Sequence, residues 1–454
     1  MKRNAAGCVQ VGGSGLGCGV WVQSAKSNSG DPLQDGSSIE SMVPGWRRCL
    51  STSVTFTPVS GKGRLKISLM KSPSHLGHFT SRVNRMYNED RYSAGVLDVH
   101  GSKVFNFNVF DGHGGDQCSA FLADNLSQHV ESADGLAAAD DAGDKRREKL
   151  IKTYAKNIGG YWKRWLRHRK QNFAGMAKSG LQLSSIDHSL DLGMRIPMSF
   201  LEADYGFFGQ KDNRLGSTCT SVFLETIYSE DGASGTKELY YFGRKTVSLL
   251  SVAQVGDTKA ILVDKNGLAH ALTEAHHPSN PLEASRLRKY AANFFMTDSF
   301  GEERFISLAN TRAFGDVEYK QMGVTAEPDM SQYIVGDGQV IRHKLTADEI
   351  KNYTVGGLGG DESFLVLCTD GVTTVLTDQE IADIVMVHVN MKGTPRATPQ
   401  VGAEEVIKFV EYVGGDDNAT CMVVRLSGWG HWPIEDRTGE LRQQRMNDER
   451  RLDR

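Results

Sequence analysis

The sequence lacks any uninterrupted apolar run close to the roughly 18–20 residues that a membrane-spanning helix needs, and its mean hydropathy is −0.37. We therefore expect no transmembrane segment. The chain also lacks an excess of either charge, because its 454 residues carry 52 Lys and Arg against 55 Asp and Glu, a formal net charge of −3. Proteins that coat nucleic acid usually carry a basic excess, so that class is disfavoured.

Paired cysteines and proline-rich linkers are absent as well. The seven cysteines are scattered and never spaced as Cys-x-x-Cys, which argues against a disulfide framework or a structural zinc site and predicts reduced thiols. Only 11 prolines stand against 49 glycines, which favours tight turns and short strands. No Pro/Ser-rich linker divides the body, so we expect one large domain over residues 66–428 and a charged extension at 429–454.

The first fifty residues differ from the rest of the chain. They are rich in Gly and Ser, and the first thirty contain three basic side chains and no acidic one. This composition predicts a mitochondrial transit peptide at 1–50, and Arg48-Cys49-Leu50-Ser51 resembles a matrix-protease cleavage pattern. We expect the protein in the mitochondrial matrix or intermembrane space. The alternative is a disordered leader on a cytoplasmic protein, which three acids between residues 31 and 40 support.

Short strands and helices alternate through the body. Val104–Phe110 alternates bulky and polar residues, which predicts a half-buried strand stopping at Asp111. Many short strands with helices between some groups predict an α+β sandwich, interrupted by a mixed-charge insertion at about 132–175. Further strands are predicted at 219–227, 247–255, 260–263, 364–368 and 419–426, helices near 121–130 and at 283–292, 378–387 and 402–412, and an Asn-Gly hairpin within 264–267.

Carboxylates recur beside the predicted strands. Asp111-Gly112 and Asp370-Gly371 each follow an apolar strand, Asp417-Asn418 precedes another, and Glu89-Asp90 stands near the start of the body. A single Asp-Gly pair is most often a turn. Several such carboxylates converging would form an all-oxygen site, which suits Mg²⁺ or Mn²⁺ better than zinc. The spacing fits neither an EF-hand nor a phosphate-binding loop.

Two other side chains near these acids suggest phosphate chemistry. His113, two residues after Asp111, could donate a proton to a leaving group. Arg85, four residues before Glu89, could clamp a phosphate. Alone, His113 would more often be a surface or packed histidine, and Arg85 a surface arginine.

Nine motifs in order between residues 77 and 426 resemble the metal-dependent protein phosphatases of type 2C. The most diagnostic is Phe110-Asp111-Gly112-His113-Gly114-Gly115. The others are Arg85 with Asn88-Glu89-Asp90, Gly216-Ser217-Thr218, Val255–Thr258, Leu272-Thr273 with His277-Pro278, Thr311–Asp316, Ala326–Asp329, Cys368–Gly371 and Asp417–Thr420.

The resemblance implies a four-layer α-β-β-α sandwich of two antiparallel sheets flanked by helices, and hydrolysis of phosphoserine and phosphothreonine. It also implies two Mn²⁺ or Mg²⁺ ions, bridged by Asp111, with a third, weaker ion near Asp257. Asp370 and Asp417 would hold the first ion. The Gly112 carbonyl and Glu89 would hold the second.

The implied catalytic residues are His113, Arg85 and Asp90. His113 would be the general acid, Arg85 the phosphate clamp, and Asp90 would orient metal-bound water. The family often carries a second Asp four residues after the first in its Asp-Gly motif, where this chain has Thr374. That departure weakens the expected third ion and leaves a catalytically weak pseudophosphatase, acting as a binding or scaffold protein, as the alternative.

The flanking segments bear on substrates and partners. Gly77–Arg82 and the segment after Trp429 resemble a fungal mitochondrial subgroup, which makes phosphorylated mitochondrial proteins, including a pyruvate dehydrogenase subunit, the expected substrates. The basic and aromatic segment Tyr161–Lys170 could bind a partner, an acidic substrate or a membrane surface. Its simpler interpretation is a solvated helix face.

Overall fold

The computed structural model describes most of the chain after residue 52, and Cys49–Arg454 forms one compact unit. The predicted leader 1–50 and the segment Tyr161–Lys170 lie outside the described residues. Within the described part, every helix is too short or too polar to cross a bilayer. The described ranges are 53–56, 65–138, 140–159, 186–208, 214–230, 240–243, 245–291, 295–297, 303–306, 308–393 and 396–452.

The first of two large sheets is antiparallel, with strand order β13-β7-β6-β5-β4. A short strand, β12 (Phe314–Gly315), pairs with the start of β6 and brings the sheet to six strands. The others are β4 (Arg91–Val99), β5 (Ser102–His113), β6 (Gly216–Ser229), β7 (Thr246–Val255) and β13 (Asp329–Gly336).

The second sheet has five antiparallel strands in the order β3-β15-β14-β8-β9. The predicted Asn-Gly turn joins β8 to β9, where Gly267 N donates to the Asp264 carbonyl at 3.0 Å. The strands are β3 (Leu76–Ser81), β8 (Lys259–Val263), β9 (Ala269–Ala271), β14 (Phe364–Cys368) and β15 (Ala419–Arg425). Two separate two-stranded pairs are β1 (Ser53–Phe56) with β2 (Leu65–Ser68) and β10 (Phe295–Thr297) with β11 (Glu303–Phe305).

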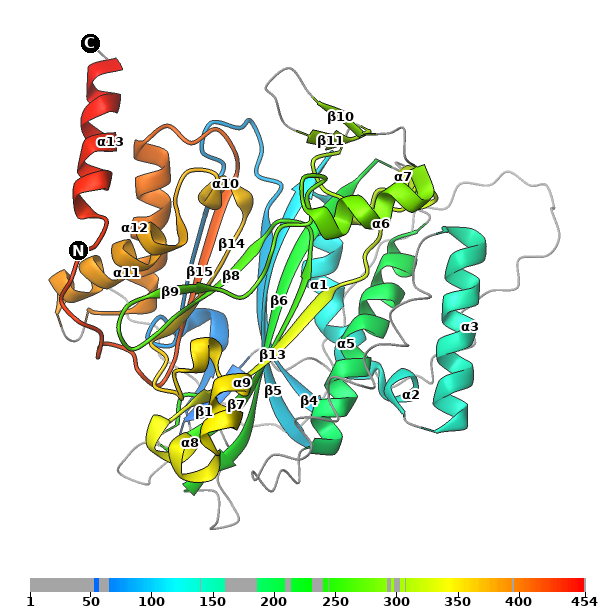
Figure 1. Cartoon of the computed structure of the whole chain (residues 1–454), viewed down its shortest axis with the longest axis horizontal. Helices are drawn as coiled ribbons and strands as arrows, with labels where there is room; N and C mark the ends of the chain where they lie inside the picture. The colour runs from blue at the N-terminus through cyan, green and yellow to red at the C-terminus, as the bar shows by residue number, and fades with distance from the viewer. Residues whose placement is uncertain are drawn as a thin grey trace, which may run out of the picture. The chain divides into compact units, whose positions relative to one another are not determined.

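Helices cover the outer face of each sheet (Figure 1). Helices α1 (Gln117–Ser132) and α5 (Ile186–Phe207) share an apolar core with the first sheet. Helices α11 (Asp378–Lys392) and α12 (Pro399–Tyr412) share another with the second sheet. A third core lies between the sheets. The predicted four-layer α-β-β-α sandwich is confirmed.

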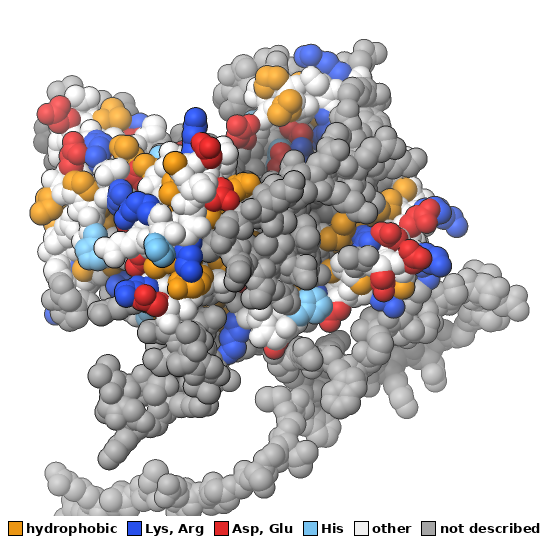
Figure 2. Space-filling view, turned by 60° about the horizontal axis from the view of Figure 1, so that its bottom comes forward, with side chains coloured by type: hydrophobic (Ala, Val, Ile, Leu, Met, Phe, Trp, Pro, Cys, Tyr) orange, Lys and Arg blue, Asp and Glu red, His pale blue; other side chains and the backbone are white. Residues whose placement is uncertain are grey.

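Shorter helices connect these layers. They are α6 (Pro281–Ala291), α7 (Val317–Lys320), α8 (Gly338–Lys344), α9 (Ala347–Tyr353) and α10 (Asp370–Thr373). Basic, acidic and apolar side chains are interspersed on the described part of the face in Figure 2, as the near-neutral charge balance predicts.

The prediction that Val104–Phe110 is half-buried was wrong, because both faces of β5 are covered. Phe105, Phe107 and Val109 point into the core between the sheets, while Asn106 and Asn108 are fully buried on the face that α1 covers. These asparagines bond to each other and to Ser127 of α1. Hydrogen bonding is what allows polar side chains to be buried there.

Strand β5 also extends beyond its predicted end. Asp111 and His113 lie within the strand and pair with Thr218 and Gly216 of β6. The ladder therefore fixes the backbone of both residues. Strand β14 has the predicted bounds, and the four described cysteines, Cys118, Cys219, Cys368 and Cys421, are buried free thiols as expected.

The insertion and the C-terminal extension pack onto the sandwich. In the insertion, α2 (Asp134–Ala137) and α3 (Asp141–Asn157) lie against α5 (Figure 1). In the extension, Trp429 and Trp432 stack edgewise on Phe364 of β14, and α13 (Gly439–Leu452) ends the described chain.

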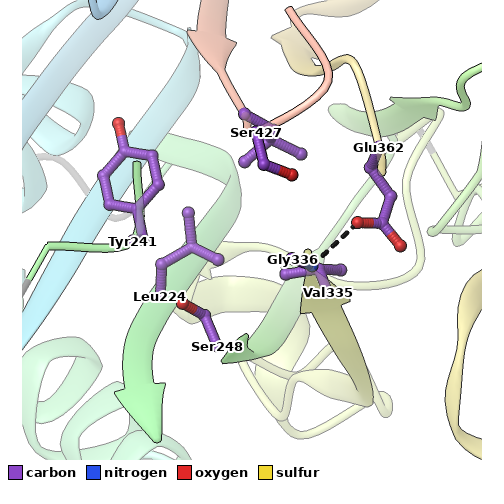
Figure 3. Close-up of a pocket in the computed structure, with 8 residues that line it drawn as sticks. Leu224, Tyr241, Ser248, Val335, Gly336, Glu362 and Ser427 are labelled. Carbon is purple, nitrogen blue, oxygen red and sulfur yellow. Dashed lines mark hydrogen bonds between the residues drawn. The ribbon is translucent and has the colours of Figure 1, made fainter. Parts of the chain in front are cut away.

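A small pocket lies at the end of the inter-sheet core where β13 finishes and β14 begins (Figure 3). Glu362 is fully buried there, and its Oε2 accepts a hydrogen bond from Gly336 N at 2.9 Å. Its Oε1 has no partner among the described residues. Burial raises the pKa of Glu362 to about 7.

We predict that Glu362→Gln stabilises the protein at pH 8. The folded protein binds the proton on Glu362 more tightly than the unfolded chain does. The protonated carboxyl therefore makes its full contribution to the free energy of unfolding below pH ~4.5, and this contribution is lost as the pH rises through about 7. The loss is about 3 kcal/mol at most. The variant should melt above wild type at pH 8, and the gap should narrow at pH 5. Glu318→Gln, at an exposed position, is the control for the loss of one negative charge. A difference in melting temperature between Glu362→Gln and wild type that is equal at pH 8 and pH 5 would contradict a raised pKa for Glu362.

Candidate active site

A cleft of about 990 Å³ opens at one end of the sandwich, where β5, β7 and β14 finish and β6, β8 and β15 begin. Its walls come from both sheets and the adjoining loops. The candidate metal-binding and catalytic residues from the sequence that line this cleft, together with Thr374, are Arg85, Glu89, Asp111, Gly112, His113, Asp257, Asp370 and Asp417.

Three of these carboxylates converge. One oxygen each of Asp111, Asp257 and Asp370 lies within 4.8 Å of the others. Asp111 comes from the end of β5, Asp257 from the turn between β7 and β8, and Asp370 from the start of α10 directly after β14. The fold thus joins residues from both sheets that are 259 positions apart at most.

Burial and mutual repulsion make these acids hard to ionise. The pKa of Asp111 lies well above its usual value because the side chain is largely removed from solvent and because Asp370, Asp90 and Asp257 are close. Burial and the neighbouring Asp257 raise the pKa of Asp370 to about 7. A nearby cation would reverse these shifts, because opposite charge favours the ionised carboxylate.

The donor set fits a hard divalent cation. Carboxylate oxygens are the ligands that Mg²⁺ and Mn²⁺ prefer, whereas zinc prefers His and Cys. The backbone at Gly112 fits as well. A Cβ there would lie 2.6 Å from the Glu89 carbonyl oxygen and 2.7 Å from Ser119 Oγ. Only glycine therefore lets β5 approach the Glu89 backbone so closely.

Asp417 and Arg85 form an ion pair at the edge of the cleft. Arg85 Nη2 donates to Asp417 Oδ2 at 2.8 Å, and Arg85 Nε donates to the Asp416 carbonyl at 2.9 Å. More than half of the Arg85 side chain remains exposed. The guanidinium is thus held at the cleft and stays accessible to an anion. Asp417 stands apart from the three converging carboxylates.

Asp90 is buried and does not line the cleft. Its Oδ2 accepts hydrogen bonds from Thr369 Oγ1 at 2.9 Å and Thr420 Oγ1 at 2.6 Å. Its Oδ1 has no partner among the described residues. Burial raises the pKa of Asp90 to about 7 despite these two hydrogen bonds.

Thr374 is the residue at which the sequence departs from the family pattern, and Asp257 is the other residue expected near a third ion. The Thr374 hydroxyl donates to the Asp370 carbonyl at 2.8 Å. Asp257 is held by His277 Nε2 at 3.2 Å and by Asn310 Nδ2, which donates at 3.1 Å. Asp257 therefore faces neutral or basic partners on this side.

His113 is paired with Asp316, which the sequence analysis placed in a motif but to which it gave no role in the site. Its Nε2 lies 2.8 Å from Oδ2 of Asp316, a carboxylate that is 1% exposed. Burial lowers the pKa of His113, but Asp316 more than offsets this and the net shift is upward. A Cβ at Gly216 would lie 2.2 Å from His113 Nε2 and 2.6 Å from Asp316 Oδ2, so only glycine leaves room for the pair.

Known proteins resemble this chain over most of its length. The family described as Protein phosphatase 2C matches residues 181–340 and 353–419. Protein phosphatase 2C homolog 4 of Schizosaccharomyces pombe is 33% identical over 398 residues, covering 85% of this chain and 89% of that protein. The chain belongs to the protein phosphatase 2C family.

Membership makes the chain a protein serine/threonine phosphatase, and the family depends on Mn²⁺ or Mg²⁺. Protein phosphatase 1K, mitochondrial, of Xenopus laevis is 35% identical over 182 residues, 40% of each chain. A solved structure titled as a phosphatase from a pathogenic strain of Toxoplasma gondii is 18% identical, covers 78% of this chain and 94% of that chain, and has a TM-score of 0.49.

In this phosphatase a buried network supports the loop that carries Asp316. Asp204 of α5 accepts a hydrogen bond from Gly315 N at 2.7 Å and pairs with Lys320 Nζ at 2.8 Å. Lys320 is fully buried and also donates to the Ala313 carbonyl at 2.6 Å. Tyr154, from α3 of the insertion, donates its hydroxyl to the same Asp204 carboxylate. The insertion therefore contributes to the support of His113.

Proposed function

We propose that the cleft hydrolyses phosphoserine and phosphothreonine with two Mn²⁺ or Mg²⁺ ions. The observation that carries this proposal is the convergence of Asp111, Asp257 and Asp370 in a cleft that also presents Arg85 and His113. Asp111 would be shared by both ions, and Asp370 and Asp417 would complete the first. Bound there, the ions would supply Lewis-acid activation of water and charge neutralisation.

The second ion would be held by Glu89 and the Gly112 carbonyl. Both line the cleft. A third, weaker ion would rely on Asp257. Thr374 would weaken that ion because its side chain carries no charge and its hydroxyl already donates to a backbone carbonyl.

The chain's own side chains would act on the substrate. Arg85 would bind the phosphoryl oxygens, since its planar guanidinium presents paired donors to such groups. His113 would give a proton to the departing seryl or threonyl oxygen. Because Nε2 is engaged by Asp316, Nδ1 is the nitrogen left for this step. Asp90, behind the cleft, would orient water through its unpartnered Oδ1.

We further propose that the substrates are mitochondrial phosphoproteins. The composition of residues 1–50 and the similarity to a relative named as mitochondrial support this location. A pyruvate dehydrogenase subunit is one proposed substrate.

Phosphate release from a phosphothreonine peptide should require Mn²⁺ or Mg²⁺ and vanish in EDTA. Asp111→Asn should abolish turnover, and it should also remove the rise in melting temperature that Mn²⁺ gives wild type. Exposed Asp348→Asn is the matched control and should behave as wild type. No release from folded wild-type protein in millimolar metal would favour the pseudophosphatase, with Thr374→Asp the first change to try.

His113→Ala and Asp316→Asn should impair poor leaving groups selectively. Removal of a general acid costs about 10²–10⁴-fold on a phosphothreonine peptide, whereas p-nitrophenolate leaves with little need for a proton. We therefore expect a much smaller loss of kcat on p-nitrophenyl phosphate. His388→Ala serves as the control histidine. Equal losses on the two substrates would argue against the assigned acid.

Residues 1–50 fused to a passenger protein should enter isolated mitochondria in a potential-dependent manner. The imported passenger should be shortened near Ser51, and Arg48→Ala should change the cleavage position without preventing import. A passenger that remains protease-sensitive outside the organelle would favour the cytoplasmic alternative.

A further inference from the structure

Two large apolar side chains stand exposed at the edge of the cleft. Met86 is 80% exposed and Tyr87 is 75% exposed. They are adjacent in the loop between β3 and β4, and they lie between Arg85 and Glu89, both of which line the cleft. Single apolar residues are common on protein surfaces. Neighbouring exposed apolar residues beside a cleft are more typical of a surface that contacts a ligand or partner.

Hydrogen bonds fix the backbone of this loop. Asn418 Nδ2 donates to the carbonyls of Tyr87 at 2.9 Å and Arg82 at 3.2 Å. Asn84 Nδ2 donates to the Gly415 carbonyl at 2.8 Å, and Arg91 Nη1 donates to the Asn88 carbonyl at 2.9 Å. The outward position of Met86 and Tyr87 is therefore built into the loop. A surface ordered in advance costs less entropy to bind.

The position of the pair limits what it can touch. Consecutive Cα atoms are about 3.8 Å apart, so Met86 and Tyr87 lie one and two residue steps from Arg85. A peptide whose phosphate reaches Arg85 would place side chains from one to three positions away over this pair. Glu89, Asp416 and Asp417 are acidic neighbours on the same rim, which disfavours an anionic lipid surface as the occupant.

We propose that Met86 and Tyr87 form an apolar contact surface that selects phosphoprotein segments carrying a large apolar residue within three positions of the phosphoserine or phosphothreonine. This inference rests on the proposed function of the cleft. Burying one such side chain against Met86 and Tyr87 should improve kcat/KM by about tenfold, the expected scale for partial burial of a Leu.

The test compares matched phosphothreonine peptides with Leu or Ser at each position from three before to three after the phosphothreonine. Wild type should prefer Leu by about tenfold in kcat/KM at one or more of these positions. The double variant Met86→Ser/Tyr87→Ser should reduce that ratio to near one by lowering turnover of the Leu peptides alone. Ile434→Ser, which changes a side chain that is 94% exposed outside the cleft, should keep the wild-type ratio.

Three outcomes would overturn the inference. Wild type could show no preference for Leu at any position, or the double variant could keep the preference. A loss of p-nitrophenyl phosphate turnover in the double variant would show that these residues support the chemistry instead of peptide choice. Failure of the proposed function is distinct, since wild type would then release no phosphate from any peptide or from p-nitrophenyl phosphate with metal present.

Discussion

Electrostatic repulsion among partly buried carboxylates is the constraint on which the rest of this structure depends. Asp111, Asp257 and Asp370 keep an oxygen each within 4.8 Å, a position that like charges resist unless a proton or a cation lies between them. Asp111 belongs to the first sheet, Asp370 follows a strand of the second, and Asp257 lies in the turn that passes from one to the other. The core between the sheets, with Phe105, Phe107, Leu365 and Leu367, supplies the burial energy that holds the two sheets and hence the acids together.

The sequence was informative where local pattern and local structure coincide. Apolar runs such as Phe364–Cys368 predicted a strand with its observed bounds, because a fully buried strand is bounded by the polar residues that follow it. The acids Asp111, Asp370 and Asp417 could be predicted from the sequence because each lies within or next to an apolar strand. Asn106 and Asn108 misled the prediction because polar residues in an alternating segment indicate solvent. Here Ser127 of α1, a helix that follows β5 in the chain, accepts a hydrogen bond from Asn108 and donates one to Asn106 in the interior.

Long-range partners were beyond the reach of sequence patterns. Asp316 lies 203 positions from His113, and its motif drew attention without revealing what the carboxylate touches. The glycines offered the one usable signal, because Gly216 pairs with His113 across the ladder and has room for neither a Cβ nor any larger group. Tyr154 gave no signal at all. It lies in a mixed-charge insertion, and its contact with Asp204 exists only because α3 packs beside α5.

Charge balance provides a physical reason for two ions in the proposed site. The cleft is lined by eight carboxylates and by three side-chain cations, Arg85, Lys259 and Arg304, a net charge of minus five when all are ionised and the histidines are neutral. Two divalent cations would offset four of these five negative charges. A third divalent cation would leave an excess of positive charge. An aspartate at position 374 could help to offset this excess, but the uncharged Thr374 cannot. The phosphate of a substrate would then bring the negative charge that Arg85, more than half exposed at the rim of the cleft, is placed to meet.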